Sequence, residues 1–307
     1  MGIGTDLGGS IRIPSSFCGI YGHKPSTGVI PNRKYWQNDE GELNNFVSTG
    51  PMCRYVQDLL LLAKILSDSD LRLRLDEKVN FRNVKVYYME EVPGYLNSAV
   101  WPIKAAVRKA ARHFENEYGI TATKVNIEEL RYGFDIWESK LLEIGSPSLA
   151  SMLSGEDAED SKINLTMELI KSFFRCSDHT WPAIFFAMVD MRKKNKFYYK
   201  SLEKFNALKT KLEELLQDDA IFLLPTHPEL PPHYLMTIPK YRNIVYTCIF
   251  NILGYPSTQI PTGLHEGIPI GIQAISRRFQ DRLTIAAAVE LDKVFNGWIS
   301  PCPVSVK

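Results

Sequence analysis

Hydrophobic positions along the chain alternate between helical and strand-like spacing. Leucine and isoleucine recur every three or four residues in 54–67, which predicts an amphipathic helix. Residues 84–89 are rich in valine and tyrosine and predict a strand, the alanine-rich segment 102–118 predicts a helix, and residues 124–127 predict another strand. This β-α-β order is typical of α/β domains, in which helices cover a sheet.

The middle of the chain is predicted to be largely helical. Helical spacing of apolar residues covers 136–144, 163–174 and 184–216. The stretch 145–162 contains Ser, Pro, Gly and acidic residues, and we expect it to be a flexible connection.

The last part of the chain returns to strands. The short apolar run 220–224 is stopped by Pro225, which is typical of a strand buried on both faces. The following elements are also predicted: strands over 257–261 and 270–276, and a helix over 282–295 that is capped by Asp281 and ended by Gly297.

The composition restricts the classes of function that the chain can have. Of the 307 residues, 45% are hydrophobic, which is enough for a sizeable core. Lys and Arg number 36 and Asp and Glu 35, so the net charge of +1 gives no global attraction for nucleic acid, and we expect a small-molecule substrate. The cysteines have no metal-ligand spacing and are expected to be reduced thiols: Cys18, Cys53, Cys176, Cys248 and Cys302.

The apolar runs are short. Residues 183–189, one of the longest, fall well below the roughly 18 residues that suggest a membrane span, and residues 1–10 lack the pattern of a secretory leader. We therefore expect an intracellular protein without a transmembrane segment. Peripheral membrane contact and a homo-oligomeric state are both compatible with this composition.

The stretch GIGTDLGGSIR, residues 2–12, is the strongest candidate for chemistry. Gly2, Gly4 and Gly8 echo the spacing of a dinucleotide-binding loop, but such a loop follows a strand and none is predicted here. The Gly-x-Ser-x-Gly elbow of α/β-hydrolases also fails, because Arg12 stands where the second glycine belongs. Both interpretations are therefore disfavoured.

A third interpretation makes Ser10 a nucleophile. Gly8 and Gly9 have no side chains, so successive backbone N–H groups can turn the same way and surround an oxyanion. Such an oxyanion forms when the serine hydroxyl attacks an amide carbonyl. A plain structural glycine turn explains the same spacing, and spacing alone leaves both interpretations open.

Residues 4–25, GTDLGGSIRIPSSFCGIYGHKP, resemble the nucleophile segment of the amidase signature family. Residues 49–59, 254–263 and 269–273 are similar to later blocks of that family, and the resemblance is weakest over 85–217. Within the family, GHKPS and GPMCRY are most similar to the fatty-acid amide hydrolases. The resemblance implies an α/β fold with a mixed β-sheet covered by helices, in one domain over residues 1–307.

The resemblance also implies amide hydrolysis through an acyl-enzyme, with no metal and no cofactor. Ser10 matches the nucleophile, and the backbone N–H groups of Leu7, Gly8, Gly9 and Ser10 match the oxyanion hole. Family members also use a serine in a Gly-Ser-Ser-Gly segment and a lysine base, both upstream of the nucleophile, and the 307 residues contain neither segment. We therefore expect an amino-terminally truncated domain with little or no activity, because serine needs a neighbour that accepts its proton.

For several other polar residues, a structural role competes with a role in catalysis. Lys24 matches a downstream block of the family rather than its catalytic lysine, and His23 and the exposed-looking His227 are expected to serve packing or loop roles. Asp6 and Arg12 flank the serine at a spacing that lets them pair and clamp the loop, with plain surface charges as the equal alternative.

Later segments contribute further candidates. Residues 224–228 follow the buried strand and either shape a substrate channel or form a plain loop, and Gln273 is interpreted as a structural strand residue. An aromatic cluster is expected to pack in the core, with an acyl-chain pocket or membrane contact as alternatives; its members are Phe173, Phe174, Trp181, Phe185, Phe186 and Met188.

The leading hypothesis is hydrolysis of a small-molecule amide at Ser10. Long-chain acyl amides are the favoured substrates, and other small carboxamides are the alternative. The competing hypothesis is a non-catalytic binding or regulatory fragment of an amidase.

Overall fold

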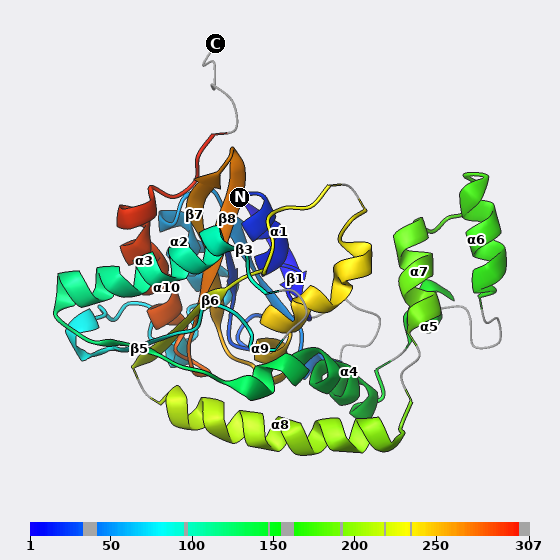
Figure 1. Cartoon of the computed structure of the whole chain (residues 1–307), viewed down its shortest axis with the longest axis horizontal. Coiled ribbons are helices and arrows are strands. Elements are labelled where there is room, and N and C mark those ends of the chain that lie inside the picture. Colours follow the sequence, from blue (N-terminus) through cyan, green and yellow to red (C-terminus); the bar gives the residue numbers. More distant parts are fainter. Residues whose placement is uncertain are drawn as a thin grey trace, which may run out of the picture.

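The computed structural model describes residues 1–32, 42–94, 98–146, 148–154, 163–190, 193–217, 219–233 and 235–300. Its centre is an eight-stranded mixed sheet with the strand order β1-β3-β2-β7-β8-β6-β4-β5 (Figure 1). β4 pairs in parallel with β5 and β6, whereas the other neighbours are antiparallel. The strands are β1 Gly2–Asp6, β2 Tyr21–Lys24, β3 Ser48–Cys53, β4 Lys85–Tyr88, β5 Ala122–Lys124, β6 Ala220–Pro225, β7 Ser257–His265 and β8 Ile268–Ile275.

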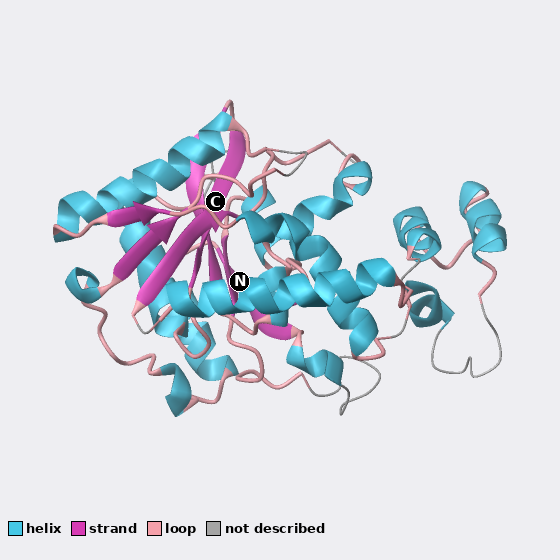
Figure 2. Cartoon of the chain, turned by 60° about the horizontal axis from the view of Figure 1, so that its bottom comes forward, coloured by secondary structure: helices cyan, strands magenta, loops and turns pink. Residues whose placement is uncertain are grey.

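Helices cover both faces of the sheet (Figure 2). Helices α2, α3 and α10 share one apolar core with the sheet, and α4, α8 and α9 share a second core with its other face. The α-helices are α1 Arg12–Phe17, α2 Gln57–Leu66, α3 Trp101–Tyr118, α4 Gly133–Glu143, α5 Leu149–Ser154, α6 Leu165–Phe173, α7 Trp181–Val189, α8 Lys196–Leu215, α9 Ile249–Ile252 and α10 Asp281–Phe295. Short 3₁₀ helices are η1 Glu42–Asn45, η2 Leu71–Leu73, η3 Phe81–Asn83, η4 Glu128–Tyr132 and η5 Ile238–Tyr246.

Strand β6 contributes to both cores. Ile221 and Leu223 belong to the core under α3 and α10, whereas Phe222 and Leu224 belong to the core under α4 and α8. All four side chains are fully buried, and each such burial stabilises the fold by about 1.5–3 kcal/mol. The strand predicted from the apolar run is therefore confirmed, and it extends through Pro225.

Helix α1, which follows Ser10, lies directly on the sheet. A Cβ atom at Gly22 of β2 would lie 2.3 Å from Ser15 Oγ of α1, so only glycine lets the helix come this close. Gly22 pairs with Gln259, Gln259 with Gln273, and Gln273 with Leu224. Because directly paired residues share a face of the sheet, Gly22 and Leu224 lie on the same face. Helix α1 packs over Gly22 and α4 and α9 share a core with Leu224, so all three helices cover that face.

Most predicted elements are confirmed, with shifted ends. The strand expected at 124–127 is β5, which begins at Ala122 and ends at Lys124. The helical stretch expected over 184–216 is divided, because α7 begins at Trp181 and α8 begins anew after Asn195, whose side chain accepts hydrogen bonds from two backbone N–H groups of the first turn. The connection expected over 145–162 contains α5, and residues 155–162 lie outside the described part.

Two expectations about element ends are wrong. A strand does precede the glycine-rich loop, because β1 pairs antiparallel with β3 in the register Gly4 to Gly50. Asp281 does not cap α10: it is the first helical residue, and its carboxylate accepts hydrogen bonds from the Ser26 N–H at 2.8 Å and the Ser26 hydroxyl at 2.5 Å. At the other end, Asn296 takes the left-handed conformation that closes the helix, and Gly297, the residue expected to end it, follows with a positive φ as well.

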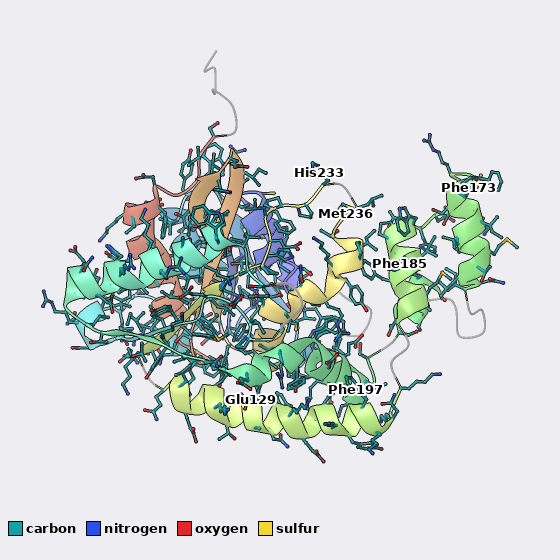
Figure 3. The ribbon with its side chains drawn as sticks, in the orientation of Figure 1. Glu129, Phe173, Phe185, Phe197, His233 and Met236 are labelled. Carbon is teal, nitrogen blue, oxygen red and sulfur yellow. The ribbon has the colours of Figure 1, made fainter. Side chains whose placement is uncertain are left out.

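The aromatic cluster also differs from expectation, because most of it does not pack in the core. Helices α5, α6 and α7 stand apart from the sheet and its covering helices, at the right of Figures 1 and 3. Phe173 is 84% exposed and Phe174 68%, and Trp181 and Met188 are also exposed. Phe186 of α7 reaches Tyr241 of η5, with ring centroids 5.8 Å apart.

Candidate active site

Ser10 lies in a bend between β1 and α1. The strand ends at Asp6, residues 7–10 turn, and the helix begins at Arg12, which leaves the Ser10 side chain exposed. Gly9 has a φ of +137°, a conformation that residues with a side chain rarely adopt. A Cβ atom there would lie 2.4 Å from Thr247 Oγ1, so the bend requires glycine for space as well as for conformation.

The buried Asp6 carboxylate organises this bend. It accepts hydrogen bonds from the Gly9 N–H at 2.7 Å and the Ile11 N–H at 3.1 Å, and from the Asn251 amide at 2.9 Å. The Arg12 guanidinium donates two further bonds, both at 3.0 Å. Burial raises the pKa of Asp6, but the charge and hydrogen bonds of Arg12 outweigh burial and lower it to about 2, so the carboxyl group is ionised at neutral pH.

Arg12 is equally buried and ties the bend to distant parts of the chain. Its guanidinium donates to the Thr247 carbonyl at 3.0 Å, to Asn251 Oδ1 at 2.6 Å and to Gln273 Oε1 at 3.3 Å. The structure thus pairs Asp6 with Arg12 inside the protein, not on its surface. Asn251 and Thr247 were not identified from the sequence, because they lie more than 230 positions along the chain from this pair and carry no motif.

The four backbone donors expected from the sequence are not equivalent. The Gly9 N–H points at Asp6, so its predicted part in an oxyanion hole does not fit this geometry. The N–H groups of Leu7, Gly8 and Ser10 have no acceptor within the described ranges. These three amides are therefore the candidates for binding a developing negative charge near Ser10.

Three basic residues considered from the sequence are buried. The Lys24 ammonium donates to the Pro25 carbonyl at 2.9 Å and to Ser48 Oγ at 3.3 Å. His23 lies between Thr258 and Asp281, 2.8 and 3.3 Å away. His227, which looks exposed in the sequence, is only 6% exposed, and burial lowers its pKa to about 4. In the described part of the chain, none of the three forms a hydrogen bond with Ser10.

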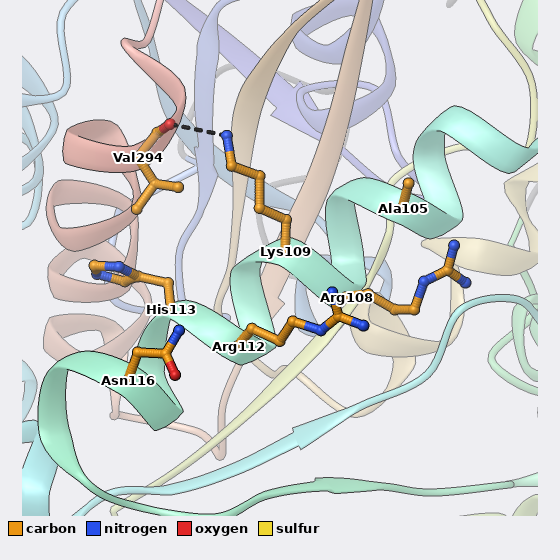
Figure 4. Close-up of a pocket in the computed structure, with 7 residues that line it drawn as sticks. All are labelled: Ala105, Arg108, Lys109, Arg112, His113, Asn116 and Val294. Carbon is orange, nitrogen blue, oxygen red and sulfur yellow. Dashed lines mark hydrogen bonds between the residues drawn. The ribbon is translucent and has the colours of Figure 1, made fainter.

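Two hollows on the surface are not lined by Ser10. One, of about 600 Å³, lies along α3, where Arg108, Lys109, Arg112 and His113 form a basic stripe beside Val294 of α10 (Figure 4). The other, of about 530 Å³, is lined by residues that include Cys18, Met52 and Trp298. Ser10 is therefore a candidate for chemistry because of the geometry of the bend, not because it lines either hollow.

The described ranges contain neither a metal-binding cluster nor a membrane-spanning helix. No group of three or more His, Cys, Asp or Glu side chains is arranged there to hold a metal ion. No helix among the described residues is both long and apolar enough to cross a bilayer.

Replacing Asp6 by asparagine is expected to destabilise the protein by about 3–5 kcal/mol, because Arg12 would then stay buried without a counter-charge. Chemical unfolding of D6N measures the loss. D76N is the matched control, since Asp76 is 89% exposed in its pair with Lys64 and its removal is expected to cost about 1 kcal/mol or less.

The ion pair between Asp6 and Arg12 also predicts a loss of stability in acid. The folded pKa of Asp6, about 2, lies below the value of about 3.9 in an unfolded chain, so the unfolded state binds more protons in this window. The free energy of unfolding should therefore fall as the pH drops from about 4 through about 2, and D6N should lack this component. An identical acid slope in wild type and D6N would contradict the assignment.

The buried Lys24 predicts a second change in the free energy of unfolding, at neutral to alkaline pH. Burial, helped by the charge of Arg12, lowers its folded pKa to about 7, below the value of about 10.4 in an unfolded chain. The unfolded state binds more protons between these values, so the free energy of unfolding should rise with pH across this window. K24M should flatten the rise, whereas K85M, which removes an exposed lysine, should keep it. A rise that persists in K24M rules out Lys24 as its source.

Comparison with known proteins identifies the family. The amidase family profile matches residues 1–285. Fatty-acid amide hydrolase 2 of Homo sapiens is 36% identical over 98% of this chain and 58% of its own length, and fatty-acid amide hydrolase 2-B of Danio rerio is 37% identical over 98% and 58%. The chain therefore spans less than two thirds of the length of these relatives.

Solved structures agree in fold. A bacterial aryl acylamidase of the amidase signature enzymes has a TM-score of 0.67 at 22% identity, with 95% of this chain and 61% of that chain covered. For 6-aminohexanoate cyclic dimer hydrolase the TM-score is 0.68 at 18% identity, over 95% and 64%. The expected α/β fold and family resemblance are confirmed, and the chain belongs to the amidase signature family, whose members hydrolyse carbon–nitrogen bonds in linear amides.

Proposed function

We propose that Ser10 is the acyl-enzyme nucleophile of an amide hydrolase acting on fatty-acid amides. The observation that carries the proposal is the bend itself, in which Ser10 is exposed and the N–H groups of Leu7, Gly8 and Ser10 have no acceptor among the described residues. The relatives named fatty-acid amide hydrolase 2 support the substrate class. Other small carboxamides are the alternative class.

The proposed chemistry follows from this arrangement. Ser10 Oγ attacks the amide carbonyl, and the negative charge that develops on the carbonyl oxygen is stabilised by backbone N–H groups beside the serine. Each donor aimed at such an oxyanion is worth roughly 2.7–4 kcal/mol of barrier. The carbon–nitrogen bond then breaks, the amine leaves with the proton that the serine hydroxyl gave up, and water hydrolyses the ester that remains on Ser10.

The proton acceptor for Ser10 is proposed to come from outside these 307 residues. Among the described side chains, none forms a hydrogen bond with the Ser10 hydroxyl, and the sequence contains no Gly-Ser-Ser-Gly segment. The matched relatives are longer than the part to which this chain corresponds. We infer that the chain represents one part of a single amidase domain and that, alone, it reacts slowly.

A fluorophosphonate probe tests this proposal. The probe should label Ser10 alone, and S10A should abolish labelling. A general base contributes about 10²–10⁴-fold, so labelling should be slower than in human fatty-acid amide hydrolase 2 by about that factor. Ser15, which is buried and donates to the Ile11 carbonyl, supplies the control S15A, which should keep the label.

The outcomes separate the hypotheses. Labelling of another residue contradicts the assignment of Ser10, and labelling as fast as in the relative contradicts the proposed missing base. Complete absence of labelling, with tight binding of a long-chain amide, favours a non-catalytic binding fragment.

We also propose that the exposed helices α6 and α7 contact a membrane surface. Helix α6 has no buried residue and carries Phe173, which points away from the body in Figure 3. Exposed apolar side chains on α6 and α7 include Met167, Leu169, Ile170, Phe173, Trp181 and Met188. Basic residues lie beside them along the chain, at Lys171, Arg175, Lys193 and Lys194. Apolar side chains flanked by basic ones are typical of peripheral binding to anionic lipid.

Cosedimentation with vesicles of phosphatidylcholine and phosphatidylserine tests this contact. Burial of each phenylalanine contributes about 1.5–3 kcal/mol, so F173S/F174S should weaken vesicle binding tenfold or more. Leu71, 90% exposed on η2, supplies the control L71S, which should bind as the wild type does. Equal binding of the double variant and the wild type would exclude these helices as the contact.

A further inference from the structure

Every carbonyl in the bend before Ser10 is held by a hydrogen bond. The Asp6 carbonyl accepts from the Asn251 amide at 2.7 Å, and the Gly9 carbonyl accepts from the Ile13 N–H at 2.8 Å. Between them, the Leu7 carbonyl accepts from the Trp137 indole N–H at 2.8 Å, and the Gly8 carbonyl accepts from the Thr247 hydroxyl at 2.6 Å. Four consecutive peptide units are therefore held, three by side chains distant in the sequence and the fourth by the first turn of α1.

Fixing a carbonyl also fixes the next N–H group. A peptide unit is planar, and in the trans form its C=O and N–H point in opposite directions; no cis peptide bond is present among the described residues. The bond from Trp137 to the Leu7 carbonyl therefore sets the direction of the Gly8 N–H. The Gly8 N–H is one of the three amides without an acceptor within the described ranges.

Trp137 also packs on the bend. A Cβ atom at Gly8 would lie 3.4 Å from Cζ2 of the indole, in ordinary van der Waals contact, so the ring covers the Gly8 backbone. Trp137 belongs to α4, and the centroid of its ring lies 5.8 Å from that of Phe134 on the same helix. Helix α4 is also joined to η5, because Arg242 donates to Asp135. The side chain thus combines a specific hydrogen bond with an apolar contact on the same peptide unit.

We propose that Trp137 is a positioning residue that aims the Gly8 N–H at the oxyanion formed at Ser10. The inference rests on the proposed function, because it concerns the charge that develops when Ser10 attacks. Trp137 does not itself touch the reacting atoms. Its indole N–H holds the Leu7–Gly8 peptide unit so that one donor is in place before the charge forms, which is the condition for effective electrostatic stabilisation.

The test uses phenylboronic acid, which does not require a protein base. The Ser10 oxygen forms a bond to boron, no bond to boron breaks, and the hydroxyl proton goes to the buffer, leaving a tetrahedral boronate anion. Boron-11 NMR follows the change from trigonal to tetrahedral boron. Benzamide, which stays neutral and trigonal, is the control ligand: a variant that changes the shape of the site should weaken its binding as well.

W137F should weaken binding of phenylboronic acid about tenfold, because phenylalanine keeps the ring contact with Gly8 but lacks the indole N–H. Binding of benzamide should change less than twofold. The control W101F removes the indole N–H of an exposed tryptophan on α3 and should alter neither affinity. Equal weakening of both probes, or unchanged boronate binding in W137F, would overturn the proposal.

A second measurement separates this inference from the proposed function. If S10A still yields the tetrahedral boron signal, or the wild type yields none, the role of Ser10 as nucleophile fails. Hydrogen exchange of the Gly8 amide then decides the role of Trp137: exchange should accelerate about tenfold in W137F and stay unchanged in W101F. An unchanged Gly8 exchange rate in W137F would overturn the positioning role.

Discussion

The bend that carries Ser10 depends on one buried ion pair, between Asp6 and Arg12. Both side chains are fully buried, and removing two charges from water costs several kcal/mol per ion unless their hydrogen-bonding capacity is satisfied. Here the carboxylate accepts from backbone and side-chain donors, and the guanidinium donates to Thr247, Asn251 and Gln273. The pair thereby joins β1 and α1 to α9, to Thr247 just before it, and to β8.

This pair determines what the bend can do chemically. Asp6 binds the Gly9 N–H and so leaves that amide unable to bind an oxyanion at Ser10. The neighbouring amides of Gly8 and Ser10 are oriented by partners of the Leu7 and Gly9 carbonyls. A bend of glycines would otherwise be flexible, and the external hydrogen bonds make it rigid enough to present donors before reaction.

The sequence predicted the parts that depend on local pattern. The motif from Gly4 to Arg12 located the bend, and the apolar run 220–224 located a strand that is buried on both faces. Strand β1 was not predicted, because glycines have low strand propensity. Position 4 is a glycine because Ile11 comes close to it: Cγ1 of Ile11 would lie 3.2 Å from a Cβ atom there.

The remaining differences come from tertiary contacts that no local pattern encodes. Asp281 stands where a helix cap is common, yet its carboxylate binds Ser26, more than 250 positions away. The same applies to His227, buried against Phe17, and to Trp137, whose partner is the Leu7 carbonyl. Phe173 was placed in the core by hydrophobicity alone, but its helix packs on neighbouring helices outside the main body and leaves it exposed.

Hydrogen exchange at two adjacent amides tests the central claim most directly. If buried Asp6 organises the bend, the Gly9 N–H, bonded to its carboxylate at 2.7 Å, should exchange at least about a hundredfold more slowly than the N–H of the exposed Ser10. Replacing Asp6 by alanine should remove that difference. Equal exchange of the Gly9 and Ser10 amides in the wild-type chain would contradict the account.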